Sequence, residues 1–296
     1  MFNFNSVSHS ICLNRYRALP LILTSSISLA AVPVYALQQG EIEVYPPNWW
    51  AGMQNPEVEL MIYGEDVADD AVSLATGNVK VSRVKALDSE NYLFVTLDTS
   101  GAQAQDLVLT LTDNDGSHRT VHYPLEKRKE GSALRQGFGP EDAIYLIAPD
   151  RFANGNAAND NVDGYQDKVD RQFKGGRHGG DIQGIVDNLD YIKSMGFTQI
   201  WTMPMLENAM DKYSYHGYST TDYYRIDPRF GSNDAFIDFS EKAKSQGVGV
   251  IMDMVLNHIG SNHRWMEDTP SKDWINNEGR FVGTTHKRES LHDPHA

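Results

Sequence analysis

Residues 41–125 contain short runs in which apolar and polar positions alternate, as in half-buried β-strands. Turn residues such as Asp113-Asn-Asp-Gly116 separate the runs, and no helical period lies between them. The pattern predicts strands at 41–45, 58–63, 79–84, 92–97, 107–112 and 120–125. Several short strands without helices indicate an immunoglobulin-like β-sandwich, which we place at residues 37–125.

The pattern changes after a charged, glycine-containing stretch, residues 126–141, which we interpret as a linker. Three apolar strands are predicted at 143–148, 197–203 and 248–254. Helices are predicted between them. The first carries its apolar residues on one face and stops at Gly196, and the second begins at a Ser232 cap and ends at Gly247. The apolar residues of the first helix are Ile182, Ile185, Val186, Leu189 and Ile192.

Strands that are apolar at nearly every position are typical of a parallel sheet covered on both faces. Repeated strand–helix units predict either a barrel or a doubly wound sheet. No glycine-rich phosphate loop follows the first of these strands, so the nucleotide-binding sheet is the weaker alternative. We therefore predict that residues 142–296 form the first part of an α/β TIM-type barrel.

The N-terminal residues have the pattern of a secretory signal peptide. Arg15 and Arg17 precede an apolar stretch, and the small-residue site at 34–36 predicts cleavage after Ala36. An N-terminal anchor helix is the alternative, which prolines and serines within the stretch disfavour. Cys12 would leave with the peptide, and a mature chain without thiols is compatible with export to the periplasm or medium.

The chain is acidic, with 26 Lys and Arg against 40 Asp and Glu, a formal net charge of −14. Loss of the signal peptide would remove two arginines and take the net charge to −16. Nucleic acids and anionic membranes select basic surfaces, so both are disfavoured as partners. A hydrophobic content of 40% is that of a globular protein.

The loop after the first apolar strand is rich in oxygen-bearing side chains. Asn154, Asn156, Asn159 and Asp160 lie within seven positions, and Gly179 and Asp181 precede the next helix. Ca²⁺ takes such ligands, although the spacing is not that of an EF-hand. From spacing alone, a calcium site and an ion-free turn are equally good interpretations.

The loops after the other two strands carry aromatic and polar side chains. His216 and Tyr218 belong to a run of aromatic residues that suits a sugar face, although such rings also pack into small cores. The third strand ends at Asp253, followed by Asn257 and His258. A buried aspartate needs a partner and is more often structural than catalytic, and a loop histidine is often already hydrogen-bonded.

Several segments together resemble the α-amylase family of glycoside hydrolases, and among them the cyclomaltodextrinase and neopullulanase group. The barrel segments are Gly196-Phe-Thr-Gln-Ile-Trp-Thr-Met-Pro204, Lys212-Tyr-Ser-Tyr-His-Gly-Tyr218, Asp227-Pro-Arg-Phe-Gly-Ser232 and Asp253-Met-Val-Leu-Asn-His258. The segments Pro46-Pro-Asn-Trp-Trp-Ala-Gly-Met53 and Asn55-Pro-Glu-Val-Glu-Leu60 resemble that group's N-terminal domain. The resemblance runs from about residue 41 to the last residue. It implies retaining hydrolysis of α-1,4 bonds in cyclodextrins, maltodextrins or pullulan.

The resemblance also implies roles for individual residues. Tyr218 would stack on the sugar at the cleavage subsite, and His216 and His258 would bind its hydroxyls. Asp253 would lie beneath that subsite, with Asn257 beside His258. The calcium ligands of part of the family match Asn154, Asn156, Asn159, Asp160, Gly179 and Asp181, which favours Ca²⁺ over the bare turn. The group often forms homodimers through its N-terminal domain.

We assign no catalytic residue in this sequence. Residues 142–296 number 155, whereas a complete barrel needs roughly 250, and three barrel strands can be identified. In the family, the nucleophile and the acid/base follow the fourth and fifth strands, which are expected beyond residue 296. Two hypotheses follow: the chain is a piece of an exported hydrolase, or it is a naturally truncated, non-catalytic carbohydrate-binding remnant.

Overall fold

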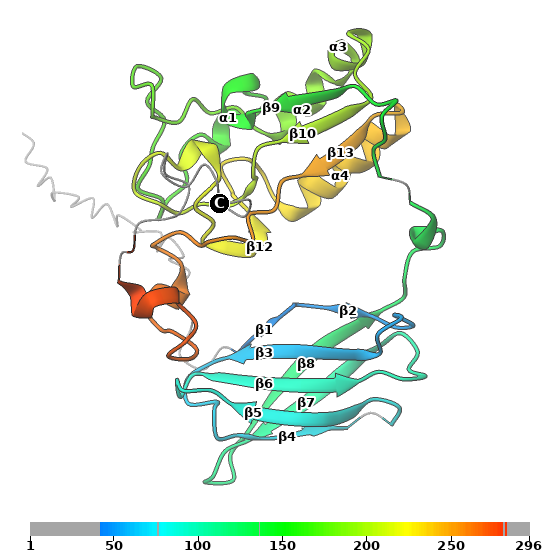
Figure 1. Cartoon of the computed structure of the whole chain (residues 1–296), viewed down its shortest axis with the longest axis vertical. Helices are drawn as coiled ribbons and strands as arrows, with labels where there is room; N and C mark the ends of the chain where they lie inside the picture. The colour runs from blue at the N-terminus through cyan, green and yellow to red at the C-terminus, as the bar shows by residue number, and fades with distance from the viewer. Residues whose placement is uncertain (1–41, 76, 136, 281, 283–296) are drawn as a thin grey trace, which may run out of the picture. The chain divides into compact units, whose positions relative to one another are not determined.

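A computed structural model of the chain describes residues 42–75, 77–135, 137–280 and 282 (Figure 1). The predicted signal peptide and its cleavage site lie outside the described residues, as do residues 283–296. The predictions for those segments therefore remain predictions.

Residues 43–126 form two four-stranded sheets. The first has the order β1(Glu43–Tyr45), β3(Glu57–Tyr63), β6(Tyr92–Asp98) and β5(Lys80–Ala86), with all neighbours antiparallel. The second has the order β2(Trp49–Trp50), β8(His118–Glu126), β7(Gln105–Thr112) and β4(Ala71–Leu74). Only the short β2 runs parallel to its neighbour, β8. All six predicted strands in this region are present, and β2 and β4 are additions.

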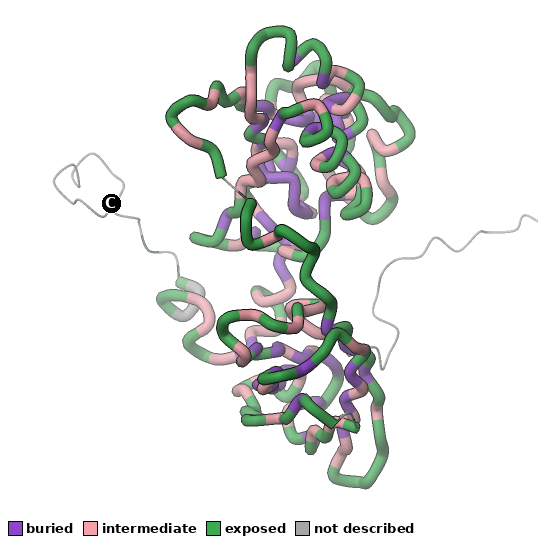
Figure 2. Tube along the Cα trace, turned by 90° about the vertical axis from the view of Figure 1, so that its right-hand side faces the viewer, coloured by how far each residue is buried: buried purple, intermediate pink, exposed green. Residues whose placement is uncertain are grey.

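The two sheets share one apolar core. Alternate side chains of β3 and β8 are buried, which is the period-2 pattern seen in the sequence. Their partners come from β6 and β7, and the buried stretches are visible in the tube of Figure 2. The fully buried members of this core include Leu60, Ile62, Leu93, Leu97, Leu107, Leu109 and Tyr123. The predicted sandwich is therefore confirmed as two sheets packed face to face.

Residues 142–252 contain a three-stranded parallel sheet in the order β13(Gly249–Met252), β10(Gln199–Thr202), β9(Ile144–Ile147). The order β9–β10–β13 across the sheet follows the chain, as expected for successive strand–helix units. α2(Ile182–Asp187) and α4(Asn233–Ser245) contact each other and pack onto the sheet, with α3(Leu189–Ser194) following α2 (Figure 1). Their core includes Ile185, Leu189, Ile192, Ile200, Phe230 and Phe239.

One prediction was wrong in detail. The single helix expected from Ile182 to Gly196 is divided into α2 and α3 at Asn188, which leaves the helical region with φ −111° and ψ 13°. The Asn188 side chain donates to the Gly184 carbonyl, so a side chain replaces part of the backbone ladder there. The other expected helix begins as predicted, because Ser232 Oγ accepts the Ala235 amide.

The remaining elements are short. They are 3₁₀ turns η1(Ser132–Leu134), η2(Ala157–Asn159), η3(Ser214–His216), η4(Arg264–Met266) and η5(Asn276–Gly279), the one-turn helix α1(Pro149–Phe152), and the antiparallel pair β11(Leu206–Glu207) and β12(Asp222–Ile226). η1 lies in the predicted linker. The loops of η2 and η3 follow the carboxyl ends of β9 and β10.

Candidate functional site

The carboxyl ends of the three parallel strands lie in register. Thr202, the last residue of β10, pairs with Ile147 of β9 on one side and Met252 of β13 on the other. Asp253 directly follows the last residue of β13. The site residues predicted from the sequence, which follow these strands, therefore lie at one edge of the sheet. Side chains at this edge are where parallel α/β sheets build their sites.

Asp253 receives two hydrogen bonds on one carboxylate oxygen. Trp201 Nε1 donates to Oδ2 over 3.3 Å, and the Tyr218 hydroxyl donates to the same oxygen over 3.2 Å. No described residue donates to Oδ1. The expectation that Asp253 is partly buried and partnered is confirmed, and its partners come from β10 and from the loop after it.

Two histidines hold the backbone of Tyr218. The Tyr218 amide donates to His216 Nδ1 over 2.9 Å, and His258 Nε2 donates to the Tyr218 carbonyl over 2.8 Å. Asn257 Nδ2 lies 3.2 Å from His258 Nδ1. All five residues predicted to contact a sugar are therefore brought together, and His258 is occupied with the backbone of Tyr218.

Protonation follows from these contacts. Burial lowers the pKa of His216, so the ring stays neutral and, with Nδ1 accepting, keeps its proton on Nε2. Burial, followed by the charge of Asp253 and the hydrogen bond to it, raises the pKa of Tyr218. The hydroxyl therefore remains a donor at neutral pH.

The ring of Tyr218 offers an open aromatic face. Its side chain is 38% exposed, and its centroid lies 5.9 Å from that of His216 with the planes 30° apart. A flat, accessible ring with hydrogen-bonding groups around it can stack on an apolar ligand face and orient its hydroxyls.

The loop after β9 brings together most of the predicted metal ligands. Asn154 Nδ2 donates to Asp160 Oδ1 over 2.6 Å, and a Cβ on Gly179 would lie 2.4 Å from that same oxygen. Asn159 Oδ1 is buried without a hydrogen-bond partner. Asn154, Asp160 and Gly179 are therefore in close contact, and Asn159 adjoins Asp160 in the chain.

The other two predicted ligands already have backbone partners. Asp181 caps α2: its Oδ1 accepts the amides of Gly184 and Gly155, and its Oδ2 accepts that of Asn156. Asn156 Oδ1 accepts the Ala158 amide. Among the described residues, no group of three or more His, Cys, Asp or Glu side chains is placed to hold a metal. A site here would therefore depend on amide and carbonyl oxygens.

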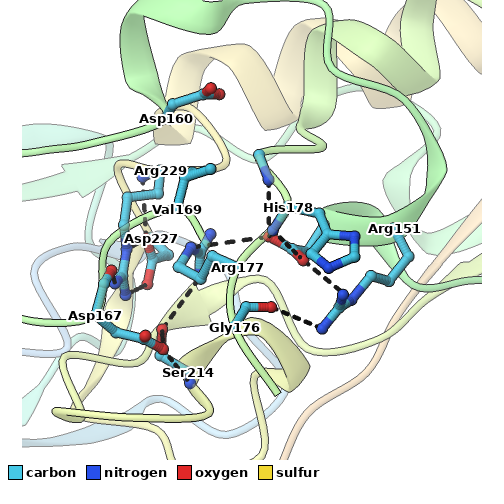
Figure 3. A network of polar contacts seen from close by, with 12 residues as sticks. Arg151, Asp160, Asp167, Val169, Gly176, Arg177, His178, Ser214, Asp227 and Arg229 are labelled. Atoms are coloured by element: carbon cyan, nitrogen blue, oxygen red, sulfur yellow. Dashed lines mark hydrogen bonds and ion pairs between the residues drawn. The ribbon is translucent and has the colours of Figure 1, made fainter. Parts of the chain in front are cut away.

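Sequence reasoning missed two arginines that flank these loops. Arg177 is completely buried, and its NH1 donates to Ser214 Oγ over 3.2 Å (Figure 3). The Arg151 guanidinium lies 4.1 Å above the centre of the Tyr215 ring. Neither belongs to a periodic segment. The one available signal was an Asp150-Arg151 pair directly after a predicted strand.

Glu207, at the end of β11, is buried and has three side-chain partners. It accepts hydrogen bonds from the hydroxyls of Tyr165 and Thr221, over 2.6 and 2.9 Å, and pairs with Arg225. Both carboxylate oxygens are therefore engaged by neighbouring side chains. These contacts favour a structural role for Glu207 over that of a nucleophile.

Comparison with known proteins gives two matched families. The profile described as "Alpha amylase, catalytic domain" matches residues 146–294, and "Cyclomaltodextrinase, N-terminal" matches residues 43–129. In the part of the chain that the structure describes, no helix is long and apolar enough to cross a membrane.

Individual relatives carry related names. A cyclomaltodextrinase of Thermoanaerobacter pseudethanolicus is 36% identical over 170 residues, covering 52% of this chain and 27% of the relative. Neopullulanase 2 of Thermoactinomyces vulgaris is 35% identical over 133 residues, covering 45% and 22%. The α-amylase of Geobacillus thermoleovorans, solved with acarbose, is 40% identical, with coverage of 45% and 27% and a TM-score of 0.37. The chain thus spans about a quarter of the length of each.

Proposed function

Because the chain belongs to the α-amylase family, we propose that the whole protein hydrolyses α-1,4-glucosidic bonds in cyclodextrins, maltodextrins or pullulan with retention of configuration. The relatives named cyclomaltodextrinase and neopullulanase support this substrate class. We further propose that β9, β10 and β13 are the first three strands of a TIM-type barrel. Residues 37–125 would be its N-terminal sandwich domain.

The observation that carries the proposal is the placement of Tyr218. Its exposed ring lies at the carboxyl edge of the sheet, and its hydroxyl is fixed by Asp253. A glucose ring stacked on this face would lie within reach of His216, whose neutral Nε2–H is free to donate to a sugar hydroxyl. Asp253 Oδ1 accepts no hydrogen bond from the described residues and provides a further acceptor.

These groups bind and orient, but they do not supply the chemistry of retaining hydrolysis. That reaction needs two carboxyl groups about 5 Å apart, one as nucleophile and one as acid/base. Asp253 is held by two donors and Glu207 is enclosed by its partners, so we assign neither role to either residue. The 296-residue chain alone is therefore expected to release no reducing sugar.

The proposal is tested by assaying the whole protein and residues 37–296 side by side. Release of reducing sugar from cyclodextrin or maltodextrin by the whole protein, with inversion excluded by NMR of the first product, is the expected result. Turnover by the short chain above that of its Tyr218→Ala variant would show that the catalytic carboxylates lie within residues 37–296. Absence of turnover by the whole protein would contradict the proposed reaction.

The second candidate function is a carbohydrate-binding protein without catalysis. It is favoured by the three side-chain partners of Glu207, because the described site then contains binding groups and no free carboxylate pair. The same experiment separates the two: a protein that binds acarbose in calorimetry and never turns over maltodextrin would be a binding protein.

We also propose a Ca²⁺ ion in the loop after β9. The buried, unpartnered Oδ1 of Asn159 and the close approach of Asp160 to Gly179 support it, since Ca²⁺ prefers oxygen donors that include carboxylates. Asn154, Asn159, Asp160 and the Gly179 carbonyl would hold the ion, with the remaining lone pairs of Asn156 and Asp181 completing the set. Bound there, the ion would cross-link the loop to the start of α2 and take no part in bond cleavage.

Export is proposed from the N-terminal sequence, with Leu37 as the mature N-terminus. N-terminal sequencing of protein recovered from the periplasm or medium of the native cell tests it. Soluble protein that still begins at Met1 would contradict it.

A further inference from the structure

Three consecutive residues ahead of Tyr218 are each held by the segment that follows β9. Tyr213 packs its ring 5.7 Å from that of Phe173. Ser214 donates from both its amide and its hydroxyl to Asp167 Oδ2, each over 2.9 Å. Tyr215 lies under the Arg151 guanidinium. The loop that carries Tyr218 therefore rests on residues 151–173.

Arg151 is fixed on its own side of this contact. Its NH2 donates to the Gly176 carbonyl over 2.8 Å, as Figure 3 shows. The same NH2 donates to the Lys174 carbonyl over 3.0 Å, and Nε lies 3.2 Å from Asp150 Oδ2. Asp150 is completely buried and accepts the amides of His178 and Gly179. The orientation of the guanidinium is therefore fixed by contacts that do not involve Tyr215.

The contact continues from Tyr215 to the sugar-facing ring. The ring centroids of Tyr215 and His216 lie 5.5 Å apart with the planes at 72°, an edge-to-face contact, and His216 in turn stacks on Tyr218. Gly217 lies between them with φ 78°, and a Cβ there would come within 2.0 Å of the Pro204 carbonyl oxygen. Because a side chain has no room at Gly217, the turn is closely packed there, so a displacement of Tyr215 would act on His216 and Tyr218 through these ring contacts.

We propose that Arg151 is a positioning residue for substrate: its cation–π contact with Tyr215 sets the ring pair His216 and Tyr218 against the sugar. This rests on the proposed function, since it assigns a role within the same site. Arg151 touches neither the sugar nor the bond that is cleaved. Its effect is on binding, because a misplaced stacking ring weakens ground state and transition state alike.

The competing interpretation is that Arg151 only holds its own loop through the carbonyls of Gly176 and Lys174. The two interpretations differ at Tyr215, which makes no contribution to those hydrogen bonds. Tyr215→Phe keeps the ring under the guanidinium, whereas Tyr215→Leu removes it. Arg151→Lys keeps a cation, whereas Arg151→Met removes it.

The test measures kcat and KM of the whole protein on maltodextrin for these four variants and for the Arg151→Met/Tyr215→Leu double variant. Arg151→Met and Tyr215→Leu should raise KM about threefold to thirtyfold, the range of one cation–π contact, with little change in kcat. Tyr215→Phe should keep the parent KM, and Arg151→Lys should raise KM much less than Arg151→Met does. The double variant should be no worse than the poorer single variant, because both remove one contact.

Tyr191→Leu, an exposed tyrosine on α3, is the matched control and should leave KM unchanged. An unchanged KM in Tyr215→Leu would overturn the proposal. So would a lowered melting temperature in Arg151→Met without a change in KM, since that is the structural interpretation. Activity of the parent enzyme reports on the proposed function separately: a parent that turns over maltodextrin while its variants keep their KM contradicts the positioning role alone.

Discussion

The Tyr218 hydroxyl donates a hydrogen bond to Asp253 Oδ2 over 3.2 Å, which joins the loop after β10 to the end of β13. The same oxygen accepts a hydrogen bond from the indole of Trp201 in β10, so Asp253, directly after β13, is fixed to the sheet while it orients the tyrosine. The ring that faces solvent is thereby tied to the rigid scaffold through its polar end. Sites supported in this way keep their geometry better than isolated loop side chains.

This relationship predicts that the ring and the hydroxyl of Tyr218 contribute separately to sugar binding. Tyr218→Ala should weaken acarbose binding about tenfold, because a stacked aromatic face contributes roughly 1.5 kcal/mol beyond its buried area. Tyr218→Phe keeps the aromatic face and should lose less affinity for acarbose than Tyr218→Ala. Titration calorimetry of the parent and both variants checks the order. Equal affinity in the parent and the Ala variant would show that the ring does not contact the sugar.

The sheet-edge cluster could be predicted from sequence because strand ends in a parallel sheet converge. Asp253 follows an apolar strand, and the Tyr218 loop follows the strand beside it, so their proximity needed only the register of β10 and β13. Arg151 and Arg177 could not be found in this way. Their partners lie in turns at 167–176 and 213–215, whose geometry depends on hydrogen bonds rather than on a period.

The secondary structure likewise divides into elements that the sequence pattern predicts and elements that it does not. β3, β7 and β8 were predicted because each buries alternate side chains against a common core, and β6 because most of its positions are apolar and buried. β2 and β11 have two residues each, too few to show any period. The break at Asn188 was missed because the apolar residues of α2 and α3 remain on one face across it, so the pattern alone continues as a single helix.

The calcium proposal predicts a ligand-dependent stability. Ca²⁺ at one hundred times its dissociation constant should raise the free energy of unfolding by about 2.7 kcal/mol, and a chelator should remove the gain. Asp160→Ala should abolish the response, because Asp160 supplies one of only two charges. Thermal melting with Ca²⁺ and with chelator is the measurement. Asp190→Ala, on the exposed side of α3, is the matched control.

Asp181→Ala is a poor substitute for that test. Its carboxylate accepts three backbone amides, so removing it should destabilise the loop and α2 whether or not an ion binds. Loss of an N-cap alone costs about 1 kcal/mol. If Asp160→Ala keeps the full response to Ca²⁺, the ion does not bind at this loop.

The close packing at Gly184 predicts that Gly184→Ala changes stability in the direction opposite to that expected from helix propensity. In an open helix, Gly→Ala stabilises by about 1 kcal/mol. Here a Cβ would lie 1.9 Å from the Ala153 carbonyl oxygen, so α2 would have to move away from the loop after β9. We expect Gly184→Ala to destabilise by about 1–3 kcal/mol, as overpacking does. Urea unfolding measures it, with the exposed neighbour Gln183→Ala as the control, and a stabilised Gly184→Ala would contradict the close packing.

His263 predicts a loss of stability at acid pH. It is 7% exposed, packs its ring 4.4 Å from that of Trp265, and accepts the Trp265 amide on Nδ1. Burial lowers the pKa of His263 from 6.5 to about 4, with the positive charge of Arg264 acting in the same direction and Glu207 opposing it. Between those two values the unfolded chain binds a proton that the folded chain does not.

The sign of the effect follows from that difference. The contribution of His263 to the free energy of unfolding is fully present above pH 6.5. It is lost as the pH is lowered towards 4, and the loss from this residue is at most about 3 kcal/mol. His263→Asn keeps an acceptor for the Trp265 amide and removes the titration, so its stability should decline less over this range. His216, whose pKa burial also lowers, titrates in the same direction in both proteins and cancels in the comparison. Urea unfolding at pH 7.5, 6, 5 and 4 measures both proteins. Parallel pH dependences would show that His263 is protonated as readily in the folded chain as in the unfolded one.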